Sequence, residues 1–287
     1  MRSACHGPCR DTKPMHRASV YRRGAARGAW EATHGCGVPT YRPLSRVVNG
    51  IDAAPHSWPW MASLQYKLRD GYVHTCGGSL ITPQWVLTAA HCITYEITYR
   101  IVLGEHDRSV EEGTEQYFPI NNKDIFGHPN WNDHCPQCGY DIALIKLPRA
   151  AELNDVVQLG CLPARERLVY GGQECYGPGW GLLYNHGPQS LILQQAMLPI
   201  VDHTQCTEPD WWGNLVNESL ICAGGYGQAS CSSDSGGPLN CQDASGRWYI
   251  DGIVSFVPVQ CNTLKKPTVF TRVSLFHDWM DEIITNN

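Results

Sequence analysis

The sequence predicts an all-β protein, a sandwich or barrel of short strands with one helix at its C-terminal end. From Val47 onward, short apolar runs alternate with Gly, Pro and Asn, as in WVLTAAH, RIVLGE, DIALIKL, GIVSF and TVFTRV. Runs of this length bounded by turn residues are typical of such folds. Only the end has helical spacing, in Phe276, Trp279, Met280 and Ile283, with Ser274 as a candidate N-cap. We expect this apolar face to pack on the β body.

Length and cysteine content narrow the class of protein further. The chain has 287 residues, enough for one large β-domain or two barrels, and it contains 14 cysteines. Cysteines scattered through a chain of this size favour an oxidising compartment, and hence secretion. The chain contains no run of eighteen apolar residues, which argues against a membrane-spanning helix.

Charge separates the start of the chain from its body. Residues 1–35 hold seven Lys/Arg and two Asp/Glu, so the body is strongly acidic although the whole chain carries only −5. An acidic body argues against nucleic acid as a partner. We expect residues 1–35 to be a disordered basic leader, because they have no periodicity. They also lack the apolar region of a secretory signal, which leaves open that the cell uses another start.

Three segments together indicate nucleophilic catalysis. VLTAAHC contains His91, YDIALIKL contains Asp141, and CSSDSGGP contains Ser235. Each alone is typical of a structural histidine, a turn or a loop. In combination they supply a hydroxyl nucleophile, an imidazole base to take its proton, and a carboxylate that orients and stabilises the base.

These residues and the motifs around them resemble the chymotrypsin-fold serine proteases of the pancreatic elastase type, and most of all elastase 3. The resemblance runs from Cys36 to the C-terminus through CGGSLI, TAAHC, DIALIKL, GWG, CAGG, DSGGPLNC and KPTVFTRVS. GEHDRSVEEGTEQ, the Cys-x-x-Cys before DIAL, and WWG point to the elastase 3 branch. It implies a protease domain at 47–287 with two six-stranded antiparallel β-barrels, at about 47–157 and 158–272, and a helix at about 274–285.

The resemblance also implies catalytic roles. His91 is expected to be the general base, Asp141 its orienting carboxylate and Ser235 the nucleophile, with Ser255 supporting Asp141. The backbone N–H groups of Ser233 and Ser235 would form the oxyanion hole. Ser233 stands where the family has glycine, a residue that tolerates unusual backbone angles and close approach of a substrate.

A zymogen is implied as well. Residues 36–46 would be an activation peptide, and a trypsin-like protease would cut after Arg46. The freed amine of Val47 would then pair with Asp234 and order the pocket and the oxyanion hole.

The resemblance assigns twelve of the 14 cysteines to six disulfides. The expected pairs are Cys36–Cys161, Cys76–Cys92, Cys135–Cys138, Cys175–Cys241, Cys206–Cys222 and Cys231–Cys261. Cys135 and Cys138 have the spacing of a zinc or redox motif, but the further ligands or βαβ context that such a site needs are missing. Cys5 and Cys9 stay unassigned.

One loop carries enough carboxylates to bind calcium. EHDRSVEEGTE holds Glu105, Asp107, Glu112 and Glu115 close together, either as solvated side chains or as hard oxygen ligands. By resemblance, the side chains of Glu105 and Glu115 and the carbonyls of Asp107 and Val110 would bind a structural Ca²⁺. The chemistry itself is expected to need no cofactor. A separate sequon, Asn217-Glu218-Ser219, predicts glycosylation of Asn217.

The primary specificity pocket is expected to accept small side chains. By resemblance, Ala229 and Ser230 would stand at its base, where a trypsin-like pocket has an aspartate. Val257 and Thr268 are at wall positions where chymotrypsin-like enzymes have glycine. Branched side chains there would fill the pocket and favour alanine, although β-branched residues are also ordinary in strands.

Two more departures from the family concern a strand and a loop. Gly177-Pro178 falls in an expected strand, where proline removes a hydrogen-bond donor, and the loop 257–261 is one residue short for elastase 3. The sequence therefore predicts a secreted, monomeric endopeptidase whose partners are peptide substrates, its activating protease and protease inhibitors. The alternatives are a homologue of impaired activity that binds proteins through the same groove, and a purely structural disulfide-rich domain.

Overall fold

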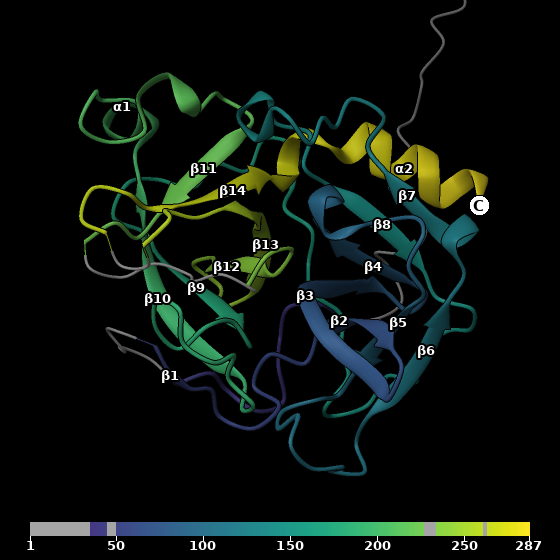
Figure 1. The fold of residues 1–287 in the computed structure, drawn as a ribbon. Coiled ribbons are helices and arrows are strands. Elements are labelled where there is room, and N and C mark those ends of the chain that lie inside the picture. The colour runs from purple at the N-terminus through teal and green to yellow at the C-terminus, as the bar shows by residue number, and fades with distance from the viewer. Residues whose placement is uncertain (1–34, 45–49, 227–233, 261–262) are drawn as a thin grey trace, which may run out of the picture.

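The computed structural model describes residues 35–44, 50–226, 234–260 and 263–287, which form two antiparallel sheets (Figure 1). The first sheet has the order β6-β5-β2-β3-β4-β8-β7. Its strands are β2 (Met61–Leu68), β3 (Gly71–Thr82), β4 (Trp85–Thr88), β5 (Tyr99–Leu103), β6 (Gln116–Ile120), β7 (Ile125–Gly127) and β8 (Ala143–Lys146).

The second sheet has the order β1-β10-β11-β14-β13-β12-β9 and closes on itself through pairing of β9 with β10. Its strands are β1 (Ile51–Asp52), β9 (Glu174–Gly179), β10 (Gln194–Val201), β11 (Leu220–Ala223), β12 (Pro238–Gln242), β13 (Trp248–Phe256) and β14 (Thr268–Arg272). The predicted two-barrel fold is confirmed. The second barrel has the expected six strands with β1 added at its edge, whereas the first sheet has seven.

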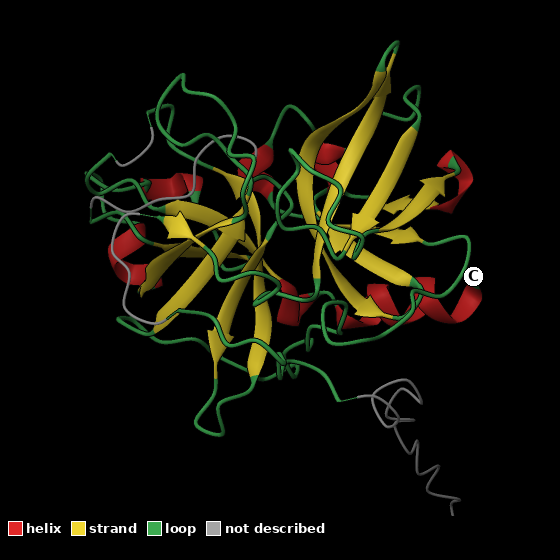
Figure 2. Ribbon diagram, turned by 90° about the horizontal axis from the view of Figure 1, so that it is seen from below, coloured by secondary structure: helices red, strands yellow, loops and turns green. Residues whose placement is uncertain are grey.

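Each apolar run of the sequence forms a strand, and the two sheets curl beside each other with loops between them (Figure 2). Strand β4 ends at the first residue of TAAHC, and strand β8 begins within DIAL. These two strands are neighbours in the sheet, where Thr88 of β4 pairs with Ala143 of β8. The short 3₁₀ helix η1 (Ala90–Cys92) follows β4 directly. The sheet thus brings the segments before β8 and after β4 to the same edge.

Buried tryptophans join the two sheets. The indole of Trp58 donates to Oε1 of Gln195 on β10 at 3.0 Å, and that of Trp60 donates to Oδ1 of Asn240 on β12 at 2.9 Å. Trp58 also meets Trp248 of β13 edge to face, with ring centroids 5.0 Å apart. Large apolar rings whose N–H groups are satisfied across the junction fix the relative position of the sheets, and with it the geometry of any site between them.

The C-terminal helix α2 (His277–Asn286) packs, as predicted, on the β body, against a cluster of buried apolar residues that includes Leu80, Leu87 and Leu144 of the first sheet. Met280 is completely buried, and Trp279 and Ile283 pack against the same cluster. The predicted cap is wrong. Ser274 lies inside the 3₁₀ helix η5 (Val273–Leu275), and Phe276 precedes the α-helix without a capping side chain.

The other helical segments are short. They are α1 (His203–Cys206), η2 (Asn122–Asp124), η3 (Pro136–Cys138) and η4 (Gly213–Leu215). Within the part of the chain that the structure describes, no helix is long and apolar enough to cross a membrane.

Candidate active site

The carboxylate of Asp141 is the centre of a buried hydrogen-bond network. Its Oδ2 lies 2.7 Å from Nδ1 of His91 and accepts from Oγ of Ser255 at 2.5 Å, while Oδ1 accepts from the backbone N–H of His91 at 3.0 Å. Asp141 is fully buried, whereas the side chain of His91 is 27% exposed. A carboxylate at Nδ1 favours the tautomer with the proton on that nitrogen, which leaves Nε2 as the acceptor.

The network joins the two sheets. His91 belongs to η1 and Asp141 precedes β8 of the first sheet, whereas Ser255 lies on β13 of the second. Thr271 of β14 adds a hydrogen bond from its Oγ1 to the carbonyl of Asp141 at 2.9 Å. Donors from both sheets therefore fix the position of one buried carboxylate. This network depends on the relative position of the two sheets, which the buried tryptophans hold.

Ser235 is anchored against the same edge of the first sheet. Its carbonyl accepts from the N–H of Gly77 on β3 at 2.8 Å. The next residue, Gly236, has φ +75°, and a Cβ there would lie 2.3 Å from Oγ1 of Thr88 and 3.1 Å from Sγ of Cys92. Glycine is required at this close approach, which brings the backbone of the Ser235 turn onto the residue that follows His91.

The carboxylate of Asp234 lies tightly against Gly179 and Gly181, and we call these three residues the Asp234 clamp. The sequence alone does not indicate this role for the two glycines. The N–H of Gly181 donates to its Oδ1 at 2.9 Å. A Cβ on Gly179 would lie 2.0 Å from that oxygen, and one on Gly181 2.5 Å from it. The GWG motif, which the family resemblance includes, therefore also has a spatial role: its two glycines leave the room that the Asp234 carboxylate occupies.

Trp180, between these glycines, ties the Asp234 clamp to the acidic loop. Its indole donates to the carbonyl of His106 at 3.1 Å, and its ring meets that of His74 edge to face. Trp180 is 1% exposed. The acidic loop and the Asp234 clamp are therefore connected through one buried residue, because Trp180 contacts the loop and lies between the two glycines that face Asp234.

In the acidic loop, two carboxylates accept hydrogen bonds from the loop's own backbone. Glu112 accepts from the N–H groups of His106 and Asp107, and Glu115 accepts from those of Glu112 and Gly113. Burial, reinforced by the charge of Glu115, raises the pKa of Glu105 to about 7. A cation in the loop would relieve this cost, so the carboxylates suit a hard cation chemically.

One group of possible metal ligands lies outside the acidic loop, but it does not form a metal site. Within the described ranges, the group of three candidate ligands that lie near one another is Cys76, His91 and Cys92. Its two sulfurs are joined in a disulfide, so they are not available as thiolate ligands.

The structure forms five of the six expected disulfides within the residues it describes. They are Cys36–Cys161, Cys76–Cys92, Cys135–Cys138, Cys175–Cys241 and Cys206–Cys222. The first links the segment before position 46 to the body across 125 residues of sequence. The second staples η1, and therefore His91, to β3.

Several predicted site residues lie outside the described residues. These are Arg46, Val47, Ala229, Ser230, Ser233, the Cys231–Cys261 pair, and Cys5 and Cys9. Of the two expected pocket walls, Thr268 is fully buried at the start of β14. Val257 is half-buried against apolar residues of the second sheet that include Leu198, Val254 and Phe270.

The remaining sequence-predicted features are accommodated by local structure. β9 pairs with β10 as far as Gly179, but it pairs with β12 only at Cys175 and Tyr176, so the missing donor of Pro178 interrupts little of the sheet. In the loop from Val257, Val259 is 94% exposed. Asn217 is exposed, and its amide donates to the carbonyl of Gln137 at 2.9 Å, a bond with which a glycan would compete.

Comparison with known proteins identifies the family. The trypsin family model matches residues 47–280. The chain belongs to the trypsin family. It is 56% identical to proproteinase E of Bos taurus over 250 residues, which cover 87% of this chain and 99% of that protein. It is 54% identical to chymotrypsin-like elastase family member 3B of Homo sapiens over 254 residues, covering 88% and 94%.

A further relative, chymotrypsin-C of Bos taurus, is 49% identical over 251 residues, covering 86% of this chain and 92% of that protein. The predicted resemblance to elastase 3 is therefore confirmed, and the chain is a serine endopeptidase of the chymotrypsin fold.

Proposed function

We propose that the protein is a secreted digestive endopeptidase, made as a zymogen, that cleaves peptide bonds after small aliphatic residues. The observation that carries this proposal is the network on Asp141, which fixes the imidazole of His91. The turn of Ser235 packs against Cys92, the residue that follows this histidine. A structural domain would have no need for a buried carboxylate with donors from two sheets. The relatives named proproteinase E and elastase support the substrate class and the zymogen.

In the proposed mechanism, Oγ of Ser235 attacks the scissile carbonyl carbon as Nε2 of His91 takes its proton. The resulting imidazolium is stabilised by Asp141, which stays ionised. The C–N bond then breaks, and His91 returns the proton to the leaving amine. Water, deprotonated by the same imidazole, attacks the acyl-enzyme and releases the acid and the serine hydroxyl.

Activation would use the clamp around Asp234. Cleavage after Arg46 would free the amine of Val47, an ammonium that can pair with the Asp234 carboxylate. Because Asp234 directly precedes Ser235, a change in its pairing acts on the nucleophile through one peptide bond. The Cys36–Cys161 disulfide would keep the cut activation peptide attached.

Specificity for small residues rests on Val257 and Thr268, with Ala229 and Ser230 at the base of the pocket. Branched walls reduce the volume left for a substrate side chain, and the base offers no carboxylate to pair with lysine or arginine. We therefore propose that a peptide amide ending in alanine is cleaved faster than those ending in phenylalanine or lysine. Faster cleavage of the lysine amide would contradict this pocket.

The experiment that tests the function is labelling of the trypsin-activated protein with a fluorophosphonate, followed by mass spectrometry of the peptide that contains Ser235. We expect one adduct, absent from the uncut protein and from a Ser235→Ala variant. Failure to label the activated wild type would favour the alternative, a binding protein of impaired activity. Ser233→Gly would then restore labelling if the oxyanion hole is at fault, since one lost donor costs about 10²–10³ in turnover.

The partners proposed are protein or peptide substrates, a trypsin-like activator and protease inhibitors, for a monomer in solution. A structural Ca²⁺ held by Glu105, Asp107, Val110 and Glu115 belongs to the same proposal. It would stabilise the loop and take no part in the chemistry.

A further inference from the structure

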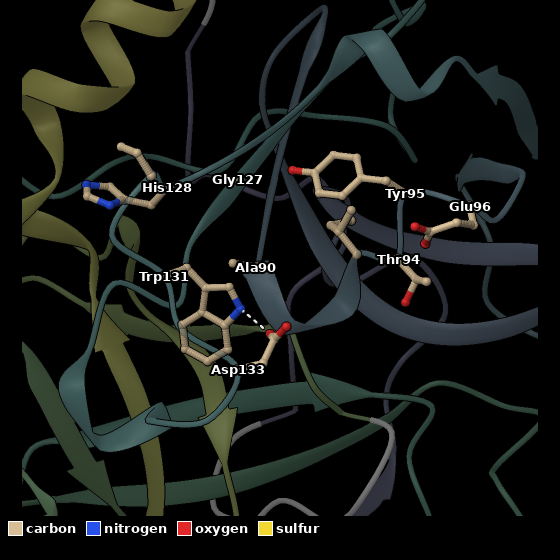
Figure 3. Close-up of a pocket in the computed structure, with 10 residues that line it drawn as sticks. Ala90, Thr94, Tyr95, Glu96, Gly127, His128, Trp131 and Asp133 are labelled. Atoms are coloured by element: carbon tan, nitrogen blue, oxygen red, sulfur yellow. Dashed lines mark hydrogen bonds between the residues drawn. The ribbon is translucent and has the colours of Figure 1, made fainter.

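A cavity of about 430 Å³ is lined by Ala90, the residue before the catalytic histidine, and by neither Val257 nor Thr268 of the expected specificity pocket. Figure 3 shows the residues that line it. Its walls are the turn after η1 and the segment after β7; the lining residues are Ala90, Ile93, Thr94, Tyr95, Glu96, Gly127, His128, Pro129, Trp131 and Asp133. Ala90 directly precedes His91, and the Trp131 ring centroid is 6.4 Å from that of the His91 imidazole. A peptide bound for cleavage at Ser235 would therefore pass close to the cavity.

Two aromatic rings and two carboxylates define its chemistry. Figure 3 shows Tyr95 and Glu96 on one side and Trp131 and Asp133 on the other. Tyr95 is 52% exposed, and both acidic side chains are exposed as well. The indole of Trp131 donates to Oδ1 of Asp133 at 2.6 Å, which fixes the ring and the carboxylate relative to each other.

No positive charge opposes these carboxylates among the lining residues, which include no lysine or arginine. Burial lowers the pKa of His128, whose ring packs against Tyr140 and against Phe276 and Trp279 at the start of helix α2. A neutral histidine whose ring packs toward the helix adds no positive charge to the cavity. The cavity therefore presents negative charge and aromatic surface together.

We propose that this cavity binds a basic side chain, arginine or lysine, of the peptide substrate at a position close to the scissile bond. Aromatic faces attract cations, and the exposed carboxylates of Glu96 and Asp133 pair with guanidinium or ammonium groups. Arginine fits best, because its planar group stacks on a ring while its N–H groups reach a carboxylate. The proposal rests on the proposed function, since it assigns a second selectivity to the same cleavage.

This selectivity is independent of the primary pocket. Val257 and Thr268 do not line the cavity, so a basic residue would be read in addition to the small residue before the cut. The enzyme would then prefer sequences that combine alanine at the cut with arginine or lysine nearby, although its primary pocket rejects basic residues.

The test uses peptide amides with alanine before the cut, in which each neighbouring position carries arginine or its uncharged counterpart glutamine. We expect kcat/KM to be on the order of tenfold higher for arginine at one position, and this ratio to fall in 0.5 M salt. In Glu96→Gln and Asp133→Asn the ratio should drop to threefold or less. Glu166→Gln, which makes the same change of charge at an exposed residue outside the cavity, should keep the wild-type ratio.

Equal kcat/KM for arginine and glutamine at every position would overturn the proposal, as would a ratio that survives both cavity substitutions. If no peptide is cleaved, the proposed function fails and the cavity is tested by binding. Calorimetry on the Ser235→Ala protein would then compare the arginine and glutamine peptides. Tighter binding of the arginine peptide that is lost in Ser235→Ala/Glu96→Gln supports the cavity, and equal binding overturns it.

Discussion

Adding one methyl group at Gly181 tests whether the position of the Asp234 carboxylate controls the position of Ser235. Gly181→Ala would place a Cβ 2.5 Å from Oδ1 of Asp234 and 2.7 Å from its Oδ2. Carbon and oxygen without a bond do not approach this closely, so the carboxylate must move away by at least about half an ångström. The N–H of residue 181 now donates to that carboxylate at 2.9 Å, and this bond would be stretched or lost.

The displacement acts on catalysis because Asp234 and Ser235 are neighbours in the chain. Misplacement of a reacting group by about 1 Å costs on the order of 100-fold in rate, so half of that predicts a loss between about 10- and 100-fold. We expect kcat/KM for an alanine peptide amide to fall by this factor in activated Gly181→Ala, with a slower reaction with fluorophosphonate.

The matched control is Gly35→Ala, because a Cβ at Gly35 meets no atom within 4 Å. Thermal unfolding monitored by circular dichroism would separate a positioning effect from a loss of folded protein. If Gly181→Ala retains kcat/KM within twofold of the wild type while remaining folded, the carboxylate of Asp234 does not position the nucleophile, and the reasoning is refuted.

Three further predictions follow from the network, the loop and a buried ion pair. Ser255→Ala removes one hydrogen bond to the buried Asp141 carboxylate, so kcat should fall by about ten- to a hundredfold with little change in KM; an unchanged kcat would exclude this support. A chelator should lower the Tm of the wild type but not of Glu105→Gln, and an unchanged wild-type Tm would exclude structural calcium. Burial raises the pKa of Asp251 to about 6, and the hydrogen bonds and charge of Arg167 oppose this rise only in part. Between pH 4 and 6 this residue is therefore protonated more in the folded chain than in the unfolded one. The free energy of unfolding should therefore fall with rising pH across this window by up to about 3 kcal/mol from this group, and Asp251→Asn should flatten that slope in denaturant titrations.

The sequence predicted the fold class because its strands are short, apolar and separated by turn residues. Residue type and order indicate a catalytic set, and the family resemblance gives TAAHC and DIAL their roles. The pairing of Thr88 with Ala143 supplies the geometry that residue order cannot give. Ser274 shows the limit of local reasoning. Its side chain could cap a helix, but the chain first makes the turn of η5, and the α-helix begins only at His277.

The residues that could not be predicted from the sequence have no reactive groups. They matter because of the space they leave or the single contact they make. Gly179 and Gly181 are needed because a carboxylate more than fifty positions later in the chain fills the room that they leave. Thr271 contributes through one hydrogen bond to the backbone of Asp141. No periodicity or motif chemistry marks such positions, because their partners are set by how two sheets meet.

The cavity beside His91 was missed for the same reason, although each of its residues is visible in the sequence. Tyr95 and Glu96 lie shortly after His91, and Trp131 and Asp133 lie more than thirty residues later, so that only the folded sheet makes them neighbours. The proposed primary pocket, lined by Val257 and Thr268, would select a small side chain, which occurs at many positions in any protein. A cavity that also rewards a nearby positive charge would restrict cleavage to a fraction of those positions. The two selectivities would be separable by mutation, because they are built from different segments of the chain.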